Sequence, residues 1–297
     1  MPLISTNPAK NYEEIGCVTP TAEADVIAAV QAAHAAKADW KALGVEERIR
    51  RLRPLQQLII DQSNDLALRI TREIGKPITE STGDIQWDVS YLQWFFDHGK
   101  ASIAPTLIKD DGHTRHELHY EPLGVCGAIA PWNFPLSMFL WGVIPNLIVG
   151  NTVVFKHSEE CPLTGKLLAD WMKALNLPVG VFTVLHGDGS VGQTLLEQPL
   201  DLIWFTGSSA TGKKIYEHAG LTLTKCLLEM GGSSPTIVFD DVDVDKVIPL
   251  LSGKRLLNCG QCCDGLKRLI VHQGIIDDVV AALKDQFEQQ VVGDPED

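Results

Sequence analysis

The chain has 297 residues, 45% hydrophobic and 21% charged, which is enough sequence for two domains with sizeable cores. Its formal net charge of -13 argues against a nucleic-acid surface, which needs a basic stripe, and against docking on anionic membranes. No window holds an apolar stretch of membrane-spanning length, and the start lacks the basic and apolar regions of a signal peptide. We therefore expect a cytoplasmic protein.

The cysteines indicate a reducing compartment. There are seven, an odd number spread over a large chain, which fits reduced thiols better than a disulfide framework. Cys262 and Cys263 are adjacent and have no clustered histidines nearby, so no metal site is predicted.

The first hundred residues predict helices. Apolar residues recur at helical spacing over 22–37 and 45–62, and Gly75-Lys76-Pro77 breaks the next helical segment. Two short extended runs, 104–109 and 116–121, then flank a polar stretch. They predict a hairpin that projects from the body.

From Gly124 onward, short β-rich runs alternate with helical patterns. The predicted strands are 124–130, 152–156, 181–185, 202–206 and 222–228, and the predicted helices are 136–149, 163–175, 191–198 and 208–219. This alternation implies right-handed βαβ crossovers and a mostly parallel, doubly wound sheet of the α/β class. A second βαβ-like stretch follows at 236–239, 244–257 and 268–272, with a final helix at 275–290.

Chemically distinctive residues follow the predicted strands. Ligands bind at the carboxyl ends of the strands in a doubly wound sheet. Lys156 ends the second strand, and Glu159 follows three residues later. The pair either binds ribose hydroxyls or consists of a surface lysine and an acid at the start of a helix. Gly207 and Gly212 bracket a turn after the fourth strand, which is either a phosphate loop or a plain turn.

The turn after the first strand holds a neutral amide. Asn133 lies between two aromatic residues and two prolines, where its N–H is either an oxyanion donor or a helix N-cap. Phe134, Met138 and Trp141 then share one helical face, which lines a substrate pocket or belongs to the core.

A thiol and a carboxylate complete the candidate chemistry. Cys262 and Cys263 follow Gly260-Gln261, downstream of Glu229 in an apolar strand. A cysteine that attacks a carbonyl forms a covalent intermediate, and a carboxylate able to activate water completes the turnover.

Five fragments, in order along nearly the whole chain, resemble successive signatures of the NAD(P)-dependent aldehyde dehydrogenase superfamily. They are Pro131-Trp132-Asn133-Phe134-Pro135, Lys156-His157-Ser158-Glu159, Phe205-Thr206-Gly207-Ser208, Leu228-Glu229-Met230-Gly231-Gly232 and Gly260-Gln261-Cys262-Cys263. The family pattern places the nucleophile two residues after the glutamine, which selects Cys263 over Cys262.

The resemblance implies a mechanism. The Cys263 thiolate adds to the aldehyde carbon, and the Asn133 amide and the Cys263 backbone N–H hold the oxyanion. Hydride leaves to the nicotinamide, and Glu229 activates the water that hydrolyses the resulting thioester. By the same resemblance, Phe134, Met138 and Trp141 line the substrate entrance and favour an apolar or aromatic aldehyde.

The resemblance also implies a cofactor site, whose residues are Trp132, Lys156, Ser158, Glu159, Gly189, Gly207, Ser208 and Gly212. A carboxylate at Glu159 repels a ribose 2′-phosphate and accepts hydrogen bonds from a free 2′-hydroxyl. NAD is therefore expected, with NADP as the alternative because Lys156 tolerates the phosphate.

The implied organisation is a doubly wound cofactor domain at 1–103 and 122–231, a projecting hairpin at 104–121 for oligomerisation, and a partial catalytic domain at 232–297. Family members continue past the end of this chain, and their Glu-x-Phe-Gly-Pro signature is absent. We therefore expect a truncated product or a fragment, with an exposed apolar face on the sheet that starts at Thr236. The resemblance also implies a homo-oligomer, which is the assembly expected of the intact family.

Three functions remain open from sequence. The first is an aldehyde dehydrogenase that hydrolyses its thioester. The second is a catalytically incomplete nucleotide-binding or interaction protein with the same fold. The third is an acyl-transferring relative that passes the thioester to coenzyme A or phosphate, against which Glu229 argues.

Overall fold

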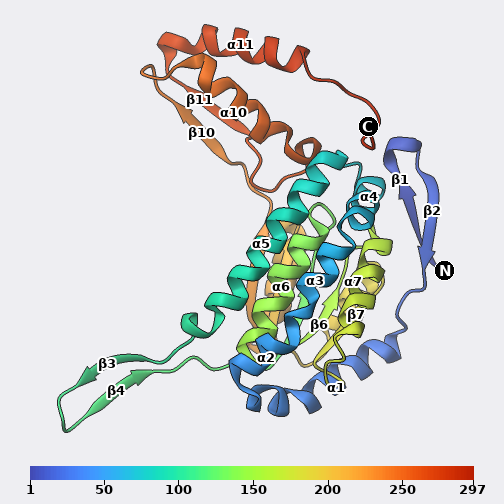
Figure 1. Cartoon of the computed structure of the whole chain (residues 1–297), viewed down its shortest axis with the longest axis vertical. Helices are drawn as coiled ribbons and strands as arrows, with labels where there is room; N and C mark the ends of the chain where they lie inside the picture. The colour runs from blue at the N-terminus through green and yellow to red at the C-terminus, as the bar shows by residue number, and fades with distance from the viewer.

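A computed structural model describes residues 1–297 (Figure 1). At its centre is a parallel sheet of five strands in the order β7-β6-β5-β8-β9. The strands are β5 (Val125–Ile129), β6 (Thr152–Lys156), β7 (Phe182–Leu185), β8 (Leu202–Gly207) and β9 (Lys225–Met230). The predicted doubly wound α/β sheet is confirmed, with β9 beginning three residues later than expected.

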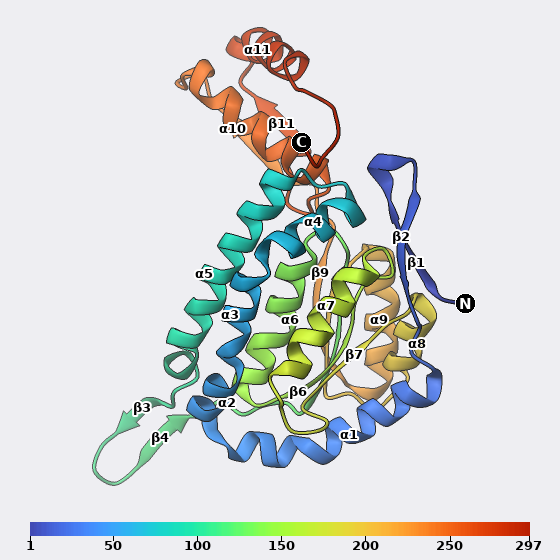
Figure 2. The ribbon, with the colours of Figure 1, turned by 45° about the vertical axis from the view of Figure 1, so that its right-hand side comes forward.

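Four helices connect these strands: α6 (Pro135–Val149), α7 (Pro162–Ala174), α8 (Gly189–Leu196) and α9 (Ser209–Thr222). Helices cover both faces of the sheet (Figure 2), and an apolar cluster lies between the sheet and the helices on each face. The larger cluster joins the sheet to α6, α7 and the helical residues between 44 and 102, and the smaller one joins it to α8, α9 and the helix at Glu23–Ala42. All four predicted crossover helices are confirmed, and each end lies within three residues of its predicted position.

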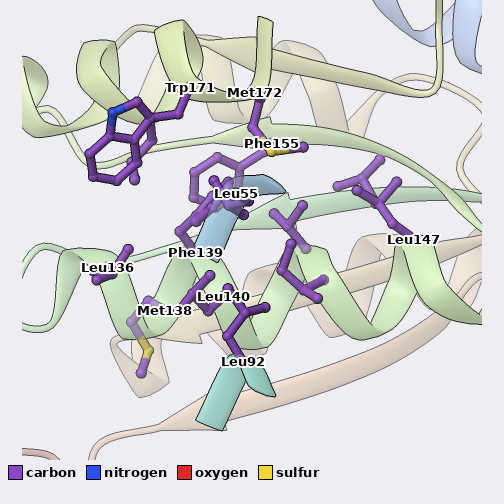
Figure 3. Packing of buried hydrophobic residues seen from close by; sticks show 14 of the residues in the cluster. Leu55, Leu92, Leu136, Met138, Phe139, Leu140, Leu147, Phe155, Trp171 and Met172 are labelled. Atoms are coloured by element: carbon purple, nitrogen blue, oxygen red, sulfur yellow. The ribbon is translucent and has the colours of Figure 1, made fainter. Parts of the chain in front are cut away.

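Helix α6 runs through the larger cluster (Figure 3). The Phe139 ring lies edge-on to Phe155 of β6, with the ring centroids 5.4 Å apart. Gly142 is packed so closely on Trp204 of β8 that a Cβ atom there would lie 2.7 Å from the indole. This packing fixes the position of the α6 amino end, and therefore of Asn133 and Phe134 beside it.

The N-terminal hundred residues are not all helical, which corrects the sequence prediction. Strands β1 (Leu3–Asn7) and β2 (Glu13–Val18) form an antiparallel pair around the short helix η1 (Pro8–Lys10). Ser5 donates a hydrogen bond to the Glu73 carboxylate at 2.7 Å. The pair is held by polar tertiary contacts rather than by an apolar face, so no alternation in the sequence reveals it.

Five helices precede the sheet: α1 (Glu23–Ala42), α2 (Gly44–Leu52), α3 (Pro54–Asp61), α4 (Ser63–Ile74) and α5 (Ile78–Ser102). The single helix predicted over 45–62 is divided at Arg53, because Pro54 lacks an N–H and starts a new helix. The predicted break between α4 and α5 is confirmed, with Gly75 at a φ of 72°.

The predicted hairpin is confirmed by strands β3 (Thr106–Asp110) and β4 (Arg115–Leu118), which pair antiparallel. It extends away from the body at the end of α5 (Figure 1). Every residue of both strands is exposed.

A second, smaller unit follows β9. It contains β10 (Pro235–Val238), α10 (Val244–Leu256), η2 (Leu257–Gly260), β11 (Arg268–Val271), η3 (Gln273–Ile275) and α11 (Ile276–Glu288). The two strands are parallel, and Ile237 pairs in register with Ile270. Ile237, Phe239 and Ile270 are exposed, at 59%, 62% and 52%, so the expected open apolar face is confirmed.

The last residues return to the body (Figure 2). The Ile78 N–H donates to the Pro295 carbonyl at 2.8 Å. Arg72 of α4 donates twice to the Glu296 carboxylate, at 3.0 and 2.8 Å. No helix of the chain has both the length and the apolar character needed to cross a bilayer.

Candidate active site

Two adjoining cavities lie at the carboxyl edge of the central sheet. The larger has a volume of about 640 Å³ and the smaller about 340 Å³. Trp132, Thr206 and Ser208 line both. Loops that follow β5 and β8 therefore form the wall between them, at the edge where α/β sheets bind ligands.

The larger cavity collects seven of the eight residues predicted for the cofactor. They are Trp132, Lys156, Ser158, Glu159, Gly189, Gly207 and Ser208. Gly212 does not line this cavity. It is buried in α9, where a Cβ atom would lie 2.5 Å from the Met230 sulfur, so close packing of helix on strand explains the glycine.

Lys156 and Glu159 are paired in the larger cavity. The Lys156 side chain is 6% exposed, and its Nζ donates to Glu159 Oε2 at 2.6 Å. A surface lysine is therefore the wrong interpretation. A buried cation and a carboxylate meet here, next to Ser158.

The turn into α9 presents a helix amino end to the same cavity. Ser208 is the N-cap, and its Oγ accepts from the Thr211 N–H at 3.2 Å. The Thr206 hydroxyl, between the cavities, is buried and has no hydrogen-bond partner. An orphaned hydroxyl, a buried ammonium and a helix dipole fit a ligand that carries both hydroxyls and a diphosphate, as a nicotinamide dinucleotide does.

The smaller cavity brings the predicted nucleophile and oxyanion donor together. Asn133, Phe134, Met138 and Cys263 all line it. The Asn133 side-chain Nδ2 donates to the Gln261 carbonyl at 2.8 Å. The N-cap of α6 is Phe134, without a side-chain cap, so the alternative role of Asn133 as an N-cap is wrong.

The two adjacent cysteines differ in environment. Cys262 is 8% exposed, and its thiol donates to Asp264 Oδ1 at 2.7 Å. Burial, followed by the Asp264 carboxylate, raises the pKa of the Cys262 thiol to about 11. Cys263 is exposed. Of the two thiols, Cys263 is therefore the accessible one.

Like Gly212, the predicted residues Glu229 and Trp141 lie outside both cavities. Glu229 is exposed on the edge strand β9, in register with Thr206, and its neighbours Met230 and Gly231 line the smaller cavity. Trp141 packs instead against two rings of α5, with ring centroids 6.0 Å from Trp87 and 5.8 Å from Tyr91. These aromatic rings extend the α6 face that carries Met138.

Sequence reasoning missed one residue that lines the smaller cavity, Lys267, and one that supports its wall, Asn258. Lys267 lines it, and its Nζ donates to the Gly232 carbonyl at 2.7 Å. Asn258, fully buried, donates through its side chain to the Asn133 carbonyl at 2.7 Å. The sequence signal was only their closeness to Cys263, which does not distinguish them from neighbours. No group of three His, Cys, Asp or Glu side chains in the chain could hold a metal ion.

Comparison with known proteins gives the family. The model of the aldehyde dehydrogenase family matches residues 2–297. The chain belongs to the aldehyde dehydrogenase family. Its paired cavities, with Cys263 in one and Lys156 in the other, therefore occur in an aldehyde dehydrogenase fold.

Several aldehyde dehydrogenases show the likeness in detail. Succinate-semialdehyde dehydrogenase [NADP(+)] GabD of Escherichia coli (strain K12) is 35% identical over 291 residues, which cover 97% of this chain and 60% of that protein. An aldehyde dehydrogenase of Aspergillus niger is 37% identical over 293 residues, 97% of this chain and 59% of that one. The chain thus spans about 60% of the length of these curated relatives.

Solved structures agree with the family assignment. The structure of PnpE in complex with nicotinamide adenine dinucleotide matches with a TM-score of 0.93 and 33% identity, over 100% of this chain and 61% of that one. Lactaldehyde dehydrogenase from Escherichia coli matches with a TM-score of 0.94 and 30% identity, over 99% of this chain and 62% of that one.

Proposed function

We propose that this chain carries the site of an NAD-dependent oxidation of an aldehyde to a carboxylic acid. The observation that carries the proposal is the meeting of Asn133, anchored through its amide, and the accessible Cys263 in one cavity beside the Lys156–Glu159 cavity. Family membership supports the reaction class.

Cys263 and Asn133 have different roles in the oxidation step. The Cys263 thiolate bonds to the aldehyde carbon, and the former carbonyl oxygen becomes an oxyanion. One Asn133 N–H is held by the Gln261 carbonyl, which leaves the second N–H to stabilise that oxyanion. Bound NAD supplies the hydride acceptor. Loss of hydride from the carbon leaves a Cys263 thioester.

Glu229 then serves as general base for deacylation. It takes a proton from water, the hydroxyl adds to the thioester carbon, and Cys263 leaves as the thiolate. Gly231, two residues further along the extended chain and so on the same side as Glu229, lines the smaller cavity, which supports this role. A Glu229→Gln variant should accumulate the thioester and show a burst of NADH that stops after one turnover. Dependence of turnover on coenzyme A or phosphate would instead indicate acyl transfer.

Among the cofactor residues, Glu159 favours NAD. Its carboxylate lines the larger cavity, so a ribose 2′-phosphate would meet a negative charge there while a 2′-hydroxyl would donate to it. Residues 1–103 and 122–231 form the proposed cofactor domain, and 232–297 the first part of the catalytic domain.

We infer the substrate class from the side chains of the pocket wall. Phe134 and Met138 line the cavity of Cys263, and Trp141 continues this face towards Trp87 and Tyr91. This wall supports an apolar or aromatic aldehyde. Benzaldehyde and hexanal, compared with succinate semialdehyde, test the preference.

A second candidate function is nucleotide binding without turnover. The observation that favours it is the exposed position of Glu229, outside the cavity of Cys263. NADH formation by the 297-residue chain, with Cys263→Ala as control, distinguishes the two. Turnover that disappears in the variant supports the dehydrogenase, and NAD binding without NADH supports the alternative.

The partner expected for the β3–β4 hairpin is a second copy of the chain. Leu107 and Ile108 on β3 are 51% and 66% exposed, and an isolated two-stranded hairpin is only marginally stable in water. Sedimentation velocity of a Leu107→Lys variant tests this assembly.

All seven cysteines are free, which supports a reducing location such as the cytoplasm.

A further inference from the structure

The turn between α4 and α5 supports the loop that carries the nucleophile. We define the nucleophile loop as residues 257–263. Its Gln261 side chain donates to the Ile74 carbonyl at 3.4 Å, and the Cys259 thiol to the Gly75 carbonyl at 3.6 Å. The Asn258 backbone N–H donates to Glu80 Oε2 at 2.6 Å, which is the shortest of the three contacts.

The nucleophile loop needs such support because its backbone is strained. Asn258, Cys259 and Gly260 have φ values of 52°, 55° and 79°, so three successive residues occupy the left-handed region. Glycine and asparagine adopt this conformation readily, whereas Cys259 carries a side chain that rarely does, so the strain is at Cys259. Strain of this kind persists only where surrounding contacts fix it.

Glu80 fixes the first residue of the strained run. Asn258 is fully buried, so without a partner its N–H would be an orphaned donor. The half-buried Glu80 carboxylate satisfies it with a charge-assisted hydrogen bond, which is stronger than a neutral one.

Asn258 in turn contacts the oxyanion donor. Its side-chain amide donates to the Asn133 carbonyl at 2.7 Å, and the Asn133 amide donates to the Gln261 carbonyl at 2.8 Å. One set of hydrogen bonds therefore links Glu80 to Asn258, Asn133 and Gln261. Both predicted oxyanion donors, the Asn133 side chain and the Cys263 backbone, depend on this geometry.

We propose that Glu80 is a positioning residue for the oxyanion site, acting through its hydrogen bond to the backbone of Asn258. The catalytic consequence of this proposal rests on the proposed function, whereas its structural consequence does not. A displaced loop would move the Asn133 N–H and the Cys263 N–H relative to each other, and such donors act only when they are preorganised.

The test compares three variants of the full 297-residue chain. Glu80→Ala removes the acceptor, Glu80→Asp keeps the charge but shortens the reach, and Glu80→Gln keeps an oxygen acceptor at the same length. Asp97→Asn, which changes a carboxylate further along α5 that pairs with Arg53, is the matched control. Should Glu80→Ala fail to fold, Glu80→Asp takes its place.

The first readout is hydrogen exchange of the peptide that spans Asn258 to Cys263. We expect protection of this peptide to fall at least tenfold in Glu80→Ala and Glu80→Asp, and to be retained in Glu80→Gln and Asp97→Asn. Unchanged protection in Glu80→Ala overturns the proposal. Equal loss in Glu80→Gln and Glu80→Ala overturns the role of the hydrogen bond.

The second readout is single-turnover NADH formation from benzaldehyde, with NAD affinity measured separately. We expect the rate to fall at least tenfold in Glu80→Ala, with rescue in Glu80→Gln and NAD affinity within twofold of the original. A rate that stays unchanged while loop protection falls overturns the catalytic role. If the original chain forms no NADH, the proposed function fails, and hydrogen exchange alone still decides whether Glu80 positions the loop.

Discussion

Asn133 donates its side-chain amide to the carbonyl of Gln261, two residues before Cys263, at 2.8 Å. This hydrogen bond joins the loop after β5 to the nucleophile loop, which lies in a different unit of the chain. The hydrogen bond therefore fixes the position of the Asn133 amide relative to the Cys263 thiol.

Removing that amide should slow the chemistry and spare the cofactor. We expect Asn133→Ala to lower the rate of NADH formation roughly 10²- to 10³-fold, the usual effect of losing one oxyanion donor. NAD affinity, measured by calorimetry, should stay the same because Asn133 does not line the larger cavity. Asn176→Ala, on the surface, is the control. A rate within threefold of the original would exclude Asn133 as an oxyanion donor.

The two adjacent thiols should alkylate at different rates. Cys262 is buried and bound to Asp264, and the pKa of its thiol is raised to about 11, so only ~0.1% of it is thiolate at pH 8. We expect iodoacetamide to modify Cys263 at least tenfold faster than Cys262, as measured by peptide mass spectrometry.

Removing the carboxylate beside Cys262 should reduce the difference. Asp264→Asn takes away the negative charge that raises the pKa of Cys262, so its alkylation should become faster. Burial remains as the larger cause, so the two rates should not become equal. Asp243→Asn is the control, and an unchanged Cys262 rate in Asp264→Asn would contradict the assigned cause.

The sequence predicted the fold where the pattern is local. Strands β5, β6 and β8 are apolar runs bounded by turn residues, and both of their faces are buried, so their positions follow from composition alone. β1 and β2 escaped prediction because they are held by polar contacts to distant segments. β9 began late because α9 continues to Thr222 and ends at Leu223 in the left-handed region.

The candidate site was predictable only to the level of its motifs. The motifs placed Cys263 and Asn133 in one cavity and most cofactor residues in the other. Trp141 lies elsewhere because the rotation of α6 turns its side chain towards Trp87 of α5. Gly212 lies elsewhere because it packs closely against Met230. No motif encodes either effect. Glu80 escaped notice because it is separated from Asn258 by 178 residues.

Exchange of one carboxylate should change the choice of cofactor. Glu159→Gln removes the charge that opposes a 2′-phosphate, so we expect the ratio of NADP to NAD affinity to rise roughly tenfold, or ~1.4 kcal/mol. Fluorescence titration with both dinucleotides measures it. Glu160→Gln changes the adjacent exposed carboxylate, which lies outside the cavity, and should leave the ratio unaltered.

A buried acid on α5 should make stability depend on pH. Asp88 is 1% exposed, Ser137 donates to its Oδ2 at 2.9 Å, and its Oδ1 has no partner. Burial raises the pKa of this carboxyl from 3.8 to about 7. Between these values the folded state keeps a proton that the unfolded state has lost. Its contribution to the free energy of unfolding therefore falls as pH rises, by about 1.4 kcal/mol per unit, and is constant above pH 7.

Asp88→Asn should remove this dependence. The variant should match the original near pH 4 and become the more stable of the two as pH approaches 7, as measured by urea unfolding at several pH values. Asp97→Asn on the same helix is the control. A stability difference that does not grow with pH would show that Asp88 does not titrate in this range.

The open face of the β10–β11 sheet should promote self-association. Ile237 and Ile270 lie opposite each other on this face and are more than half exposed, which leaves an apolar surface beside unpaired strand edges. We expect Ile270→Lys to reduce association in sedimentation velocity without lowering the melting temperature, because the side chain has few packing contacts to lose. Val280→Lys removes an equally exposed apolar side chain from α11 and serves as the control. Equal effects of the two variants would show that association follows general surface hydrophobicity rather than the sheet face.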